Sequence, residues 1–287
     1  MKRNKFNKND FTTNSLPSTR KEQFKDILKT NYRTIFRLGL LMLIFSIPIL
    51  VFYFFKNATI SSVIKSYLDG KITIDEEVNL LNSSYLFLDL IETACLIIFF
   101  IGISGTFRVL RVMAWEQGLF LWNDFKVGIK SNFKKYFIFS LFTGALIFAI
   151  DLCGTSLYAL TDKANIINII IMIILFSLVI PIILYMLAQY NYYDNSFSST
   201  FTNSFRLTII EFKNNILFSL CFLIFYLLSF ISIGLVTIGI FVLLILFILP
   251  IYLLAWNQFS LHVFDKFINE ILGIKDKGLY VKNEIVK

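Results

Sequence analysis

Three acidic residues lie inside long apolar stretches of the sequence, where an ionised side chain is unfavourable. Asp89 and Glu92 fall in one stretch and Asp151 falls in another. A charged group at membrane depth costs about 3 kcal/mol on insertion scales unless it is paired or hydrated. Because Asp89 and Glu92 are three residues apart, they share one face of a helix. These acids are the candidate site residues.

Carboxylates in such a setting suit a cation site, a proton site or hydrogen-bond acceptors for a polyol. If the first stretch runs inward and the second outward, all three acids lie about one to two helical turns below the outer surface. We expect Asp89, Glu92 and Asp151 to meet there in one outward-opening acidic pocket. The alternative is that they are solvated in the outer interface or paired with Lys56, the basic residue nearest that depth.

The composition indicates what positions these acids. Of the 287 residues, 57% are apolar and 16% are charged, with a mean hydropathy of +0.72. Soluble domains carry roughly 25% charged residues. The apolar residues gather in runs of about 20, the length at which a helix crosses a hydrocarbon core of about 30 Å. Their continuity disfavours barrel strands, whose polarity alternates. The sequence therefore predicts an all-α, polytopic membrane protein.

We expect six transmembrane helices, at 35–55, 86–107, 136–159, 166–190, 216–233 and 235–256. Of the 27 Lys and Arg residues, 23 fall on one side of these spans and 4 on the other. Positive loops stay cytoplasmic, so we expect a multi-pass plasma-membrane protein with both termini in the cytoplasm. The net charge of +8 then orients the chain and contacts anionic lipid headgroups. No nucleic-acid-binding motif accompanies it, and no nucleic-acid partner is expected.

A repeat organises the chain. FKDILKTNYR, at 24–33, resembles FKVGIKSNFK, at 125–134, and a weaker copy, FRLTIIEFK, occupies 205–213. In the second copy, apolar residues at helical spacing oppose lysines, which is typical of a helix in the membrane interface. The sequence thus predicts three units, each an amphipathic cytoplasmic elbow helix followed by a transmembrane hairpin. The alternative is that the copies are only the basic flanks of spans. The units are 24–107, 125–190 and 205–257.

The chain divides into a flexible polar N-terminal segment (1–23), a membrane domain (24–257) and a cytoplasmic C-terminal helix and tail (258–287). Segments under about 40 residues rarely fold alone, so no soluble catalytic domain is expected. His262 lies on an apolar helical stripe, and no HExxH, GxSxG or metal-spaced Cys/His set occurs. We expect no enzymatic activity, no cofactor and no metal.

Three aromatic residues that end alternate spans are predicted headgroup anchors: Trp115, Tyr190 and Trp256.

The segment from Gly105 to Lys135 carries a basic arm and then an aromatic W-x-D-F segment. With a proline in the first span, this pattern resembles the YesL-like family of small bacterial integral membrane proteins, over roughly 24–141 and loosely over 201–264. The chain departs from the family in its longer, acidic outer loop, 56–85. The resemblance implies no activity, and it implies association with carbohydrate-uptake systems. The matching residues are Pro48, Arg108, Arg111, Leu121, Trp122, Asp124, Phe125 and Phe133.

Two functions follow as expectations. The first is an accessory or regulatory component that docks a membrane partner, such as a permease, through its basic and aromatic cytoplasmic loops. The alternative is a small-solute or ion transporter or channel that uses the acidic pocket and the proline-containing spans. The candidate docking residues are Arg108, Arg111, Trp115, Trp122, Asp124, Phe125, Lys126 and Phe133.

Overall fold

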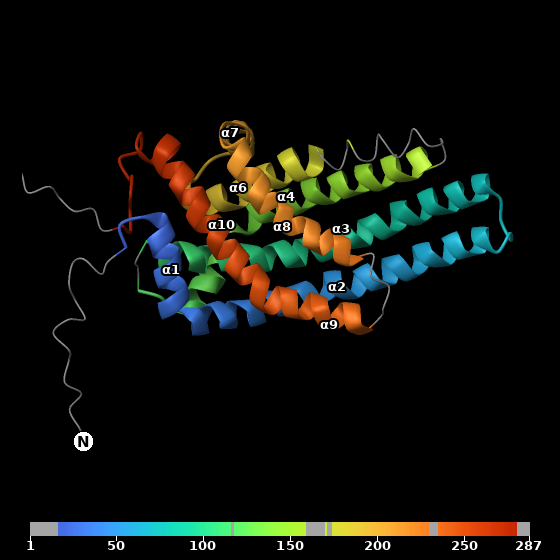
Figure 1. Ribbon diagram of the computed structural model, residues 1–287, viewed down its shortest axis with the longest axis horizontal. Helices are drawn as coiled ribbons and strands as arrows, with labels where there is room; N and C mark the ends of the chain where they lie inside the picture. Colours follow the sequence, from blue (N-terminus) through green and yellow to red (C-terminus); the bar gives the residue numbers. More distant parts are fainter. Residues whose placement is uncertain (1–16, 116–117, 159–169, 171–173, 230–234, 280–287) are drawn as a thin grey trace, which may run out of the picture.

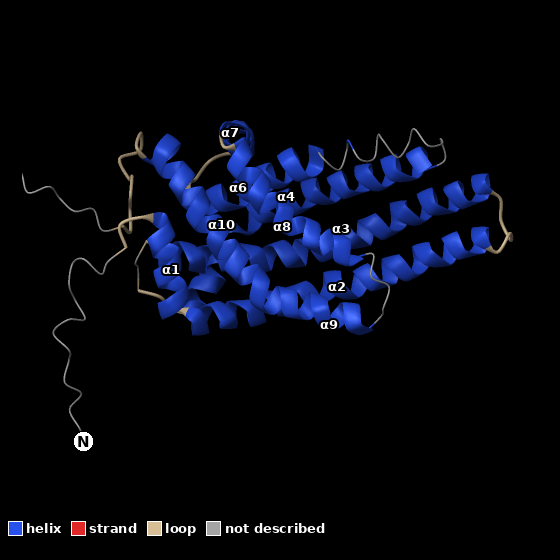
Figure 2. Ribbon diagram, viewed as in Figure 1, coloured by secondary structure: helices blue, strands red, loops and turns tan. Residues whose placement is uncertain are grey.

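The computed structural model describes residues 17–115, 118–158, 170, 174–229 and 235–279. Within these ranges every regular element is helical (Figure 2). In chain order the elements are α1 (Arg20–Thr30), α2 (Tyr32–Leu68), α3 (Ile74–Ala114), α4 (Leu121–Tyr158), the π-helix η2 (Leu175–Val179), α6 (Ile180–Tyr192), α7 (Phe197–Ile210), α8 (Phe212–Ser229), α9 (Leu235–Leu243), the π-helix η3 (Leu244–Ile248), α10 (Leu249–Phe264) and the π-helix η4 (Asp265–Asn269).

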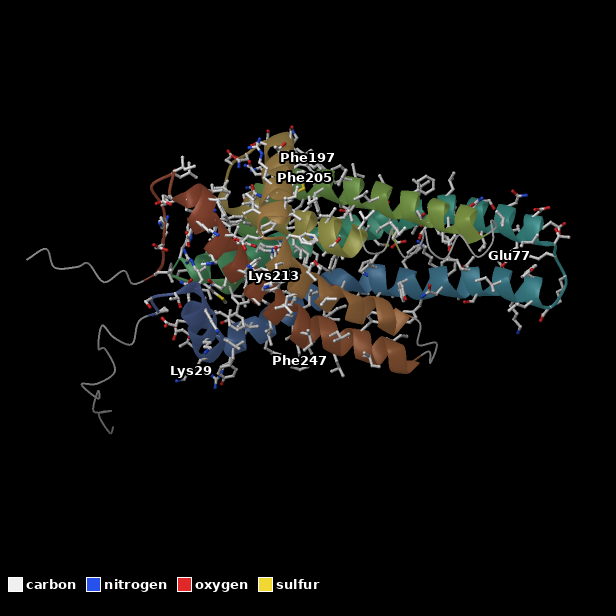
Figure 3. The ribbon with its side chains drawn as sticks, turned by 45° about the horizontal axis from the view of Figure 1, so that its top comes forward. Lys29, Glu77, Phe197, Phe205, Lys213 and Phe247 are labelled. Atoms are coloured by element: carbon white, nitrogen blue, oxygen red, sulfur yellow. The ribbon has the colours of Figure 1, made fainter. Side chains whose placement is uncertain are left out.

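Helices α2 and α3 form a long hairpin that projects beyond most of the other helices (Figure 1). Glu77 lies near its tip (Figure 3). The tip turns at Gly70, whose φ of +69° suits glycine because it has no Cβ. Helix α3 then begins in a capping box, in which Thr73 N donates to Glu76 Oε2 and Glu76 N donates to Thr73 Oγ1. The segment 56–85, which we expected to form an outer loop, is helical on both sides of a short turn.

Three helical segments of the described chain are long and apolar enough to cross a membrane: Tyr32–Leu68, Ile74–Ala114 and Ile238–Asn269. They overlap the predicted spans at 35–55, 86–107 and 235–256, and α4 covers most of the span at 136–159. The predicted spans at 166–190 and 216–233 lie partly outside the described residues. At 1.5 Å per residue, α2 and α3 are about 55–60 Å long, well beyond a hydrocarbon core of about 30 Å.

The first and third elbow copies differ from the second. Helix α1 ends at Asn31, whose φ of −113° and ψ of 21° are not helical, and α7 ends at Glu211 before α8 begins. The second copy forms the first turns of α4 without a break, so a separate second elbow helix was a wrong expectation. Asn132 corresponds to Asn31 in the repeat, but its Nδ2 donates to Asn191 Oδ1 at 3.1 Å. This contact with α6 holds Asn132 inside a continuous helix.

The helices do not end at the predicted domain limits. Residues 1–16 and 280–287 lie outside the described residues. Helix α1 begins at Arg20 rather than after residue 23, and the buried Arg20 guanidinium lies 2.8 Å from Asp265 Oδ2. Gln23 Nε2 donates to the carbonyl of Ala114 at 2.6 Å. Helix α10 runs across the predicted limit at 257. The described flanks of the membrane domain are thus packed against it.

The aromatic residues predicted as headgroup anchors pack inside the protein. Trp256 is fully buried, and its Nε1 donates to the carbonyl of Leu184 at 3.0 Å. Tyr190 is buried as well, and Trp115 packs on Tyr192 with ring centroids 5.3 Å apart. The anchor prediction is wrong for Trp256 and Tyr190, because their rings fill the space between α6 and its neighbours.

A glycine lets α2 approach the π-helical turn η3. A Cβ on Gly39 would lie 2.0 Å from the carbonyl oxygen of Leu246, and a backbone atom cannot move aside cheaply. Gly239 in α9 has no atom within 4 Å of the same position among the described residues. The two glycines therefore form a matched pair.

We expect Gly39→Ala to destabilise the protein by about 1–3 kcal/mol, because the new methyl group forces α2 away from η3. Thermal unfolding in detergent measures the effect. Gly239→Ala is the control, and it should leave the midpoint unchanged or raise it, since alanine favours helix. Equal midpoints for Gly39→Ala and wild type would contradict this packing.

Candidate functional site

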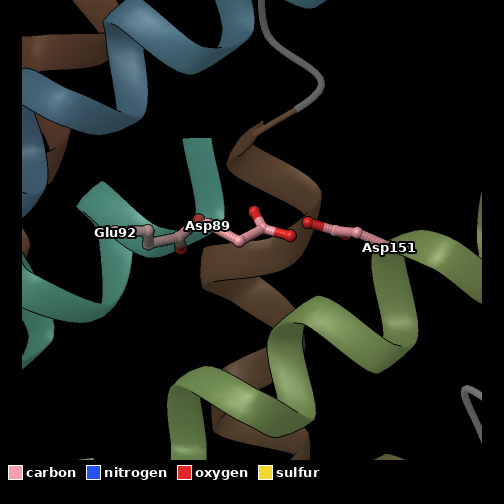
Figure 4. Close-up of side chains that lie close together, drawn as sticks. All are labelled: Asp89, Glu92 and Asp151. Carbon is pink, nitrogen blue, oxygen red and sulfur yellow. The ribbon is translucent and has the colours of Figure 1, made fainter. Parts of the chain in front are cut away.

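Lys56 of α2 lies among three carboxylates from α3 and α4. Its Nζ is 2.6 Å from Asp89 Oδ1, 2.6 Å from Glu92 Oε2 and 2.7 Å from Asp151 Oδ2. An ammonium group has three N–H donors, so each donor has a carboxylate acceptor. We call these four residues the Lys56 cluster. Figure 4 shows the three acids, with the carboxyl groups of Asp89 and Asp151 facing each other from α3 and α4.

Close packing of α3 and α4 brings the acids together. Asp89 and Glu92 are one turn apart on α3. A Cβ on Gly144 of α4 would lie 2.2 Å from Thr93 Oγ1, so glycine permits the helices to approach there. Thr93 Oγ1 donates to the carbonyl of Asp89 at 2.7 Å, which turns this side chain along its own helix. Asp151 lies about two turns beyond Gly144 and reaches the same point.

The cluster is buried on one side and accessible on the other. Asp89 is 3% exposed and Lys56 is 9% exposed, whereas the side chains of Glu92 and Asp151 are 17% and 25% exposed. Asp89 Oδ2 has no hydrogen-bond partner among the described residues. Asp89 also lines a cavity of about 370 Å³ between α3 and α4, whose other walls are mostly apolar. Glu92 and Asp151 are therefore the members most accessible to a small ion.

The formal charge of the cluster is not balanced. Three carboxylates and one ammonium carry a charge of −2 when all are ionised. Burying unbalanced charge costs several kcal/mol per ion, so such a site favours taking up a proton or another cation. One oxygen from each acid lies within 4.8 Å of the others, a spacing that a metal ion could bridge. In this structure the Lys56 ammonium occupies that place.

Both sequence interpretations of the acids are partly represented here. The structure brings Asp89, Glu92 and Asp151 to one point, and it also pairs all three with Lys56. Pairing with Lys56 was the alternative expectation, and the structure adds that one ammonium group contacts all three acids at once. The signal for Lys56 in the sequence was its place as the first charged residue after an apolar run that begins at Leu38.

Some of the predicted docking residues are exposed in the structure, and others are buried. Trp122 is 58% exposed, Phe133 is 46% exposed, and the Lys126 ammonium lies 4.9 Å from the centroid of the Trp122 ring. The prediction that Phe125 belongs to a docking surface is wrong, because Phe125 is 1% exposed. Its ring packs on Gly105, where a Cβ would lie 2.7 Å from the ring. Asp124 Oδ2 accepts from Phe120 N at 2.8 Å and so stabilises the start of α4.

The two arginines of the predicted docking surface, Arg108 and Arg111, mainly contact other parts of the protein. Arg111 donates to the carbonyl of Asn191, and its guanidinium stacks on the Trp115 ring at 4.4 Å. Both side chains are only partly exposed, so these contacts face the protein interior more than the solvent. Arg108 packs over Gly128, whose Cβ would lie 2.5 Å from Arg108 Cβ. A free docking surface is therefore limited to the start of α4.

We expect Lys56→Met to destabilise the protein by about 3–5 kcal/mol, because the buried Asp89 and the partly buried Glu92 and Asp151 lose the one ammonium partner they have among the described residues. Thermal unfolding in detergent measures it. The loss should shrink as the pH is lowered, because a protonated acid needs no counter-ion.

A control separates this effect from the loss of any lysine. Lys135 pairs with the exposed Asp194 at 2.7 Å, so Lys135→Met should change the midpoint little. Adding Glu92→Gln and Asp151→Asn to Lys56→Met should restore much of the stability. If the triple variant is no more stable than Lys56→Met, the charge argument is wrong.

No family model, no curated protein and no solved structure matches this chain.

Proposed function

We propose that this chain is a multi-pass membrane protein that transports a solute or ion by taking up and releasing a proton at the Lys56 cluster. The observation that carries the proposal is the excess of two carboxylate groups over ammonium groups in a partly buried site. A group of this kind marks proton relays and ion pathways in membrane proteins, because an unpaired charge there is costly.

The membrane arrangement in this proposal is the one expected from the sequence, with six spans in three hairpins and both termini in the cytoplasm. Its support is the distribution of basic residues and the three long apolar helices. Arg37 and Lys56 are 19 residues apart on one helix. That separation is about 28 Å, close to the thickness of a hydrocarbon core. With Arg37 at the inner boundary, the cluster lies at the outer boundary.

A proton would act on helix packing as follows. Asp151 is the acid that α4 contributes, whereas Asp89 and Glu92 both belong to α3. Protonation of Asp151 removes its charge-assisted contact with Lys56 and so weakens the tie between α2 and α4. The remaining acids keep the ammonium neutralised. Proton uptake at the more exposed acids is thereby linked to the position of α4, which is the coupling that a proton-driven transporter requires.

The test is proton movement into liposomes that contain the purified full-length protein and an internal pH-sensitive dye. A membrane potential set with potassium and valinomycin drives the protons. We expect wild type to acidify the lumen faster than protein-free liposomes. Asp151→Asn should lower the rate to that background, because the amide cannot take up a proton.

The matched control is Asp194→Asn, which alters an acid paired with a lysine on the surface. A hydrogen bond from Lys135, together with its positive charge, lowers the pKa of Asp194, so this acid holds no proton near neutral pH. Asp194→Asn should transport as wild type does. If wild type moves no protons above background, or if Asp151→Asn moves them equally well, the proposal fails.

A second candidate function is an accessory subunit that docks a membrane partner such as a permease, in line with the association with carbohydrate uptake that the resemblance to the YesL-like family implies. The observation that favours it is the exposed surface at the start of α4. Phe120 is 73% exposed and lies beside Trp122, and Lys126 and Lys130 are exposed on the same helix. Exposed apolar groups beside basic ones typify protein contact sites and interfaces with anionic lipid headgroups.

Cysteine labelling tests this surface and the proposed topology together, in a background without Cys95, Cys153 and Cys221. Lys71→Cys, at the hairpin tip, should react with a membrane-impermeant maleimide in intact cells. Trp122→Cys should react only in inverted vesicles. A docked partner should slow that reaction about tenfold relative to the pure protein in liposomes, because it covers the thiol. Equal rates in the two preparations would contradict docking, and labelling of Trp122→Cys in intact cells would contradict the topology.

A further inference from the structure

A groove of about 520 Å³ runs between the start of α2 and the junction of η3 with α10. This volume falls within the range of about 300–1,000 Å³ that is typical of small-molecule sites. Phe36 and Phe247 both line it and contact each other, with ring centroids 5.6 Å apart. Both rings are exposed, at 40% and 46%. Phe247 lies along one edge of the molecule, with Lys29 of α1 further along the same edge (Figure 3).

The groove is charged at one end and apolar at the other. Arg33 and Arg37 line it one turn apart on α2, and both are exposed. Among the described residues neither forms an ion pair with a carboxylate, and Arg33 Nε donates to Tyr32 Oη at 3.0 Å. Further along α2 the wall is Leu40, opposite Leu246 and Ile251. The ligand that fits has an anionic head and a hydrocarbon tail.

The two helical segments that line the groove touch at Gly39, where a Cβ would lie 2.0 Å from the carbonyl oxygen of Leu246, itself a lining residue. The buried Ile35 of α2 lines the groove as well. The apolar walls therefore belong to two helices that cannot move apart without losing the contact at Gly39. A hydrocarbon chain in the groove lies parallel to α2, the direction in which lipid chains run beside a membrane-spanning helix.

We propose that this groove is a binding site for one anionic phospholipid, with its phosphate on Arg33 and Arg37 and an acyl chain packed against Phe36, Leu40 and Phe247. The argument is charge complementarity. Two guanidinium groups with no carboxylate partner in the described part of the chain lie where an apolar helix begins, and guanidinium binds phosphate with paired hydrogen bonds. The site is separate from the Lys56 cluster, and it rests on the proposed topology only for the leaflet that supplies the lipid.

The test is native mass spectrometry of the full-length protein in detergent, titrated with phosphatidylglycerol and, separately, with net-neutral phosphatidylethanolamine. We expect wild type to bind phosphatidylglycerol at least about tenfold more tightly. Arg33→Gln with Arg37→Gln should weaken that binding about thirtyfold, on the scale of about 1 kcal/mol per basic residue near anionic lipid. Leu40→Trp should also weaken it, because the larger ring fills the apolar end.

Each variant has a matched control. Lys130 and Lys134 are also exposed and one turn apart at the start of an apolar helix, so Lys130→Gln with Lys134→Gln makes the same charge change elsewhere. Ile44 is exposed one turn beyond Leu40 and does not line the groove, so Ile44→Trp controls for size. Both controls should bind the lipid within about twofold of wild type, since neither alters the site.

Several results would overturn the proposal. Equal losses in the lysine and arginine variants would show general attraction to the basic face, and full binding by Leu40→Trp would show that no chain enters the groove. Competition by glycerol phosphate at the same concentration as the lipid would show a free-phosphate site instead. Thermal unfolding of each variant shows that it is folded. Asp151→Asn should keep its lipid affinity, so failure here and failure of proton transport are separate outcomes.

Discussion

The burial of the Lys56 ammonium among three carboxylates is the constraint on which the arrangement of α2, α3 and α4 depends. Each partner alone would be an unpaired charge in an apolar setting, so the three helices are stable together only if they bring these groups to one point. The distances of 2.6–2.7 Å show that they do so with direct contacts. Because charge remains unbalanced, the same contacts that hold the helices together are sensitive to a proton.

Polar contacts at the far end of α2 complement this constraint. Arg20 pairs with Asp265, and Gln23 donates to Ala114 and to Gly278. These bonds join α1 to the end of α3 and to the segment after α10. A helix bundle whose surface is largely apolar gains little specificity from hydrophobic contact alone in a membrane, so such polar pairs define which helices meet.

Close approach between helices makes both sites possible. Gly144 lets α4 reach Thr93 beside the cluster, and Gly39 lets α2 reach the backbone of η3 at Leu246, which lines the groove. The acidic pair on α3 could be recognised from its spacing in the sequence. The position of Asp151 against it, 59 residues after Glu92, depends on how α3 and α4 pack. Nothing in local sequence encodes that distance.

The sequence by itself determined the helical class, the apolar segments, the repeat and the acids worth testing, because periodicity, hydropathy and charge are properties of short segments. Only the tertiary structure decided the rest. Lys56 became the centre of the cluster, Phe125 and Trp256 entered the core, and Asn132 continued a helix that Asn31 ends. In each case the same residue type has two acceptable environments, and a contact with a distant helix chooses between them.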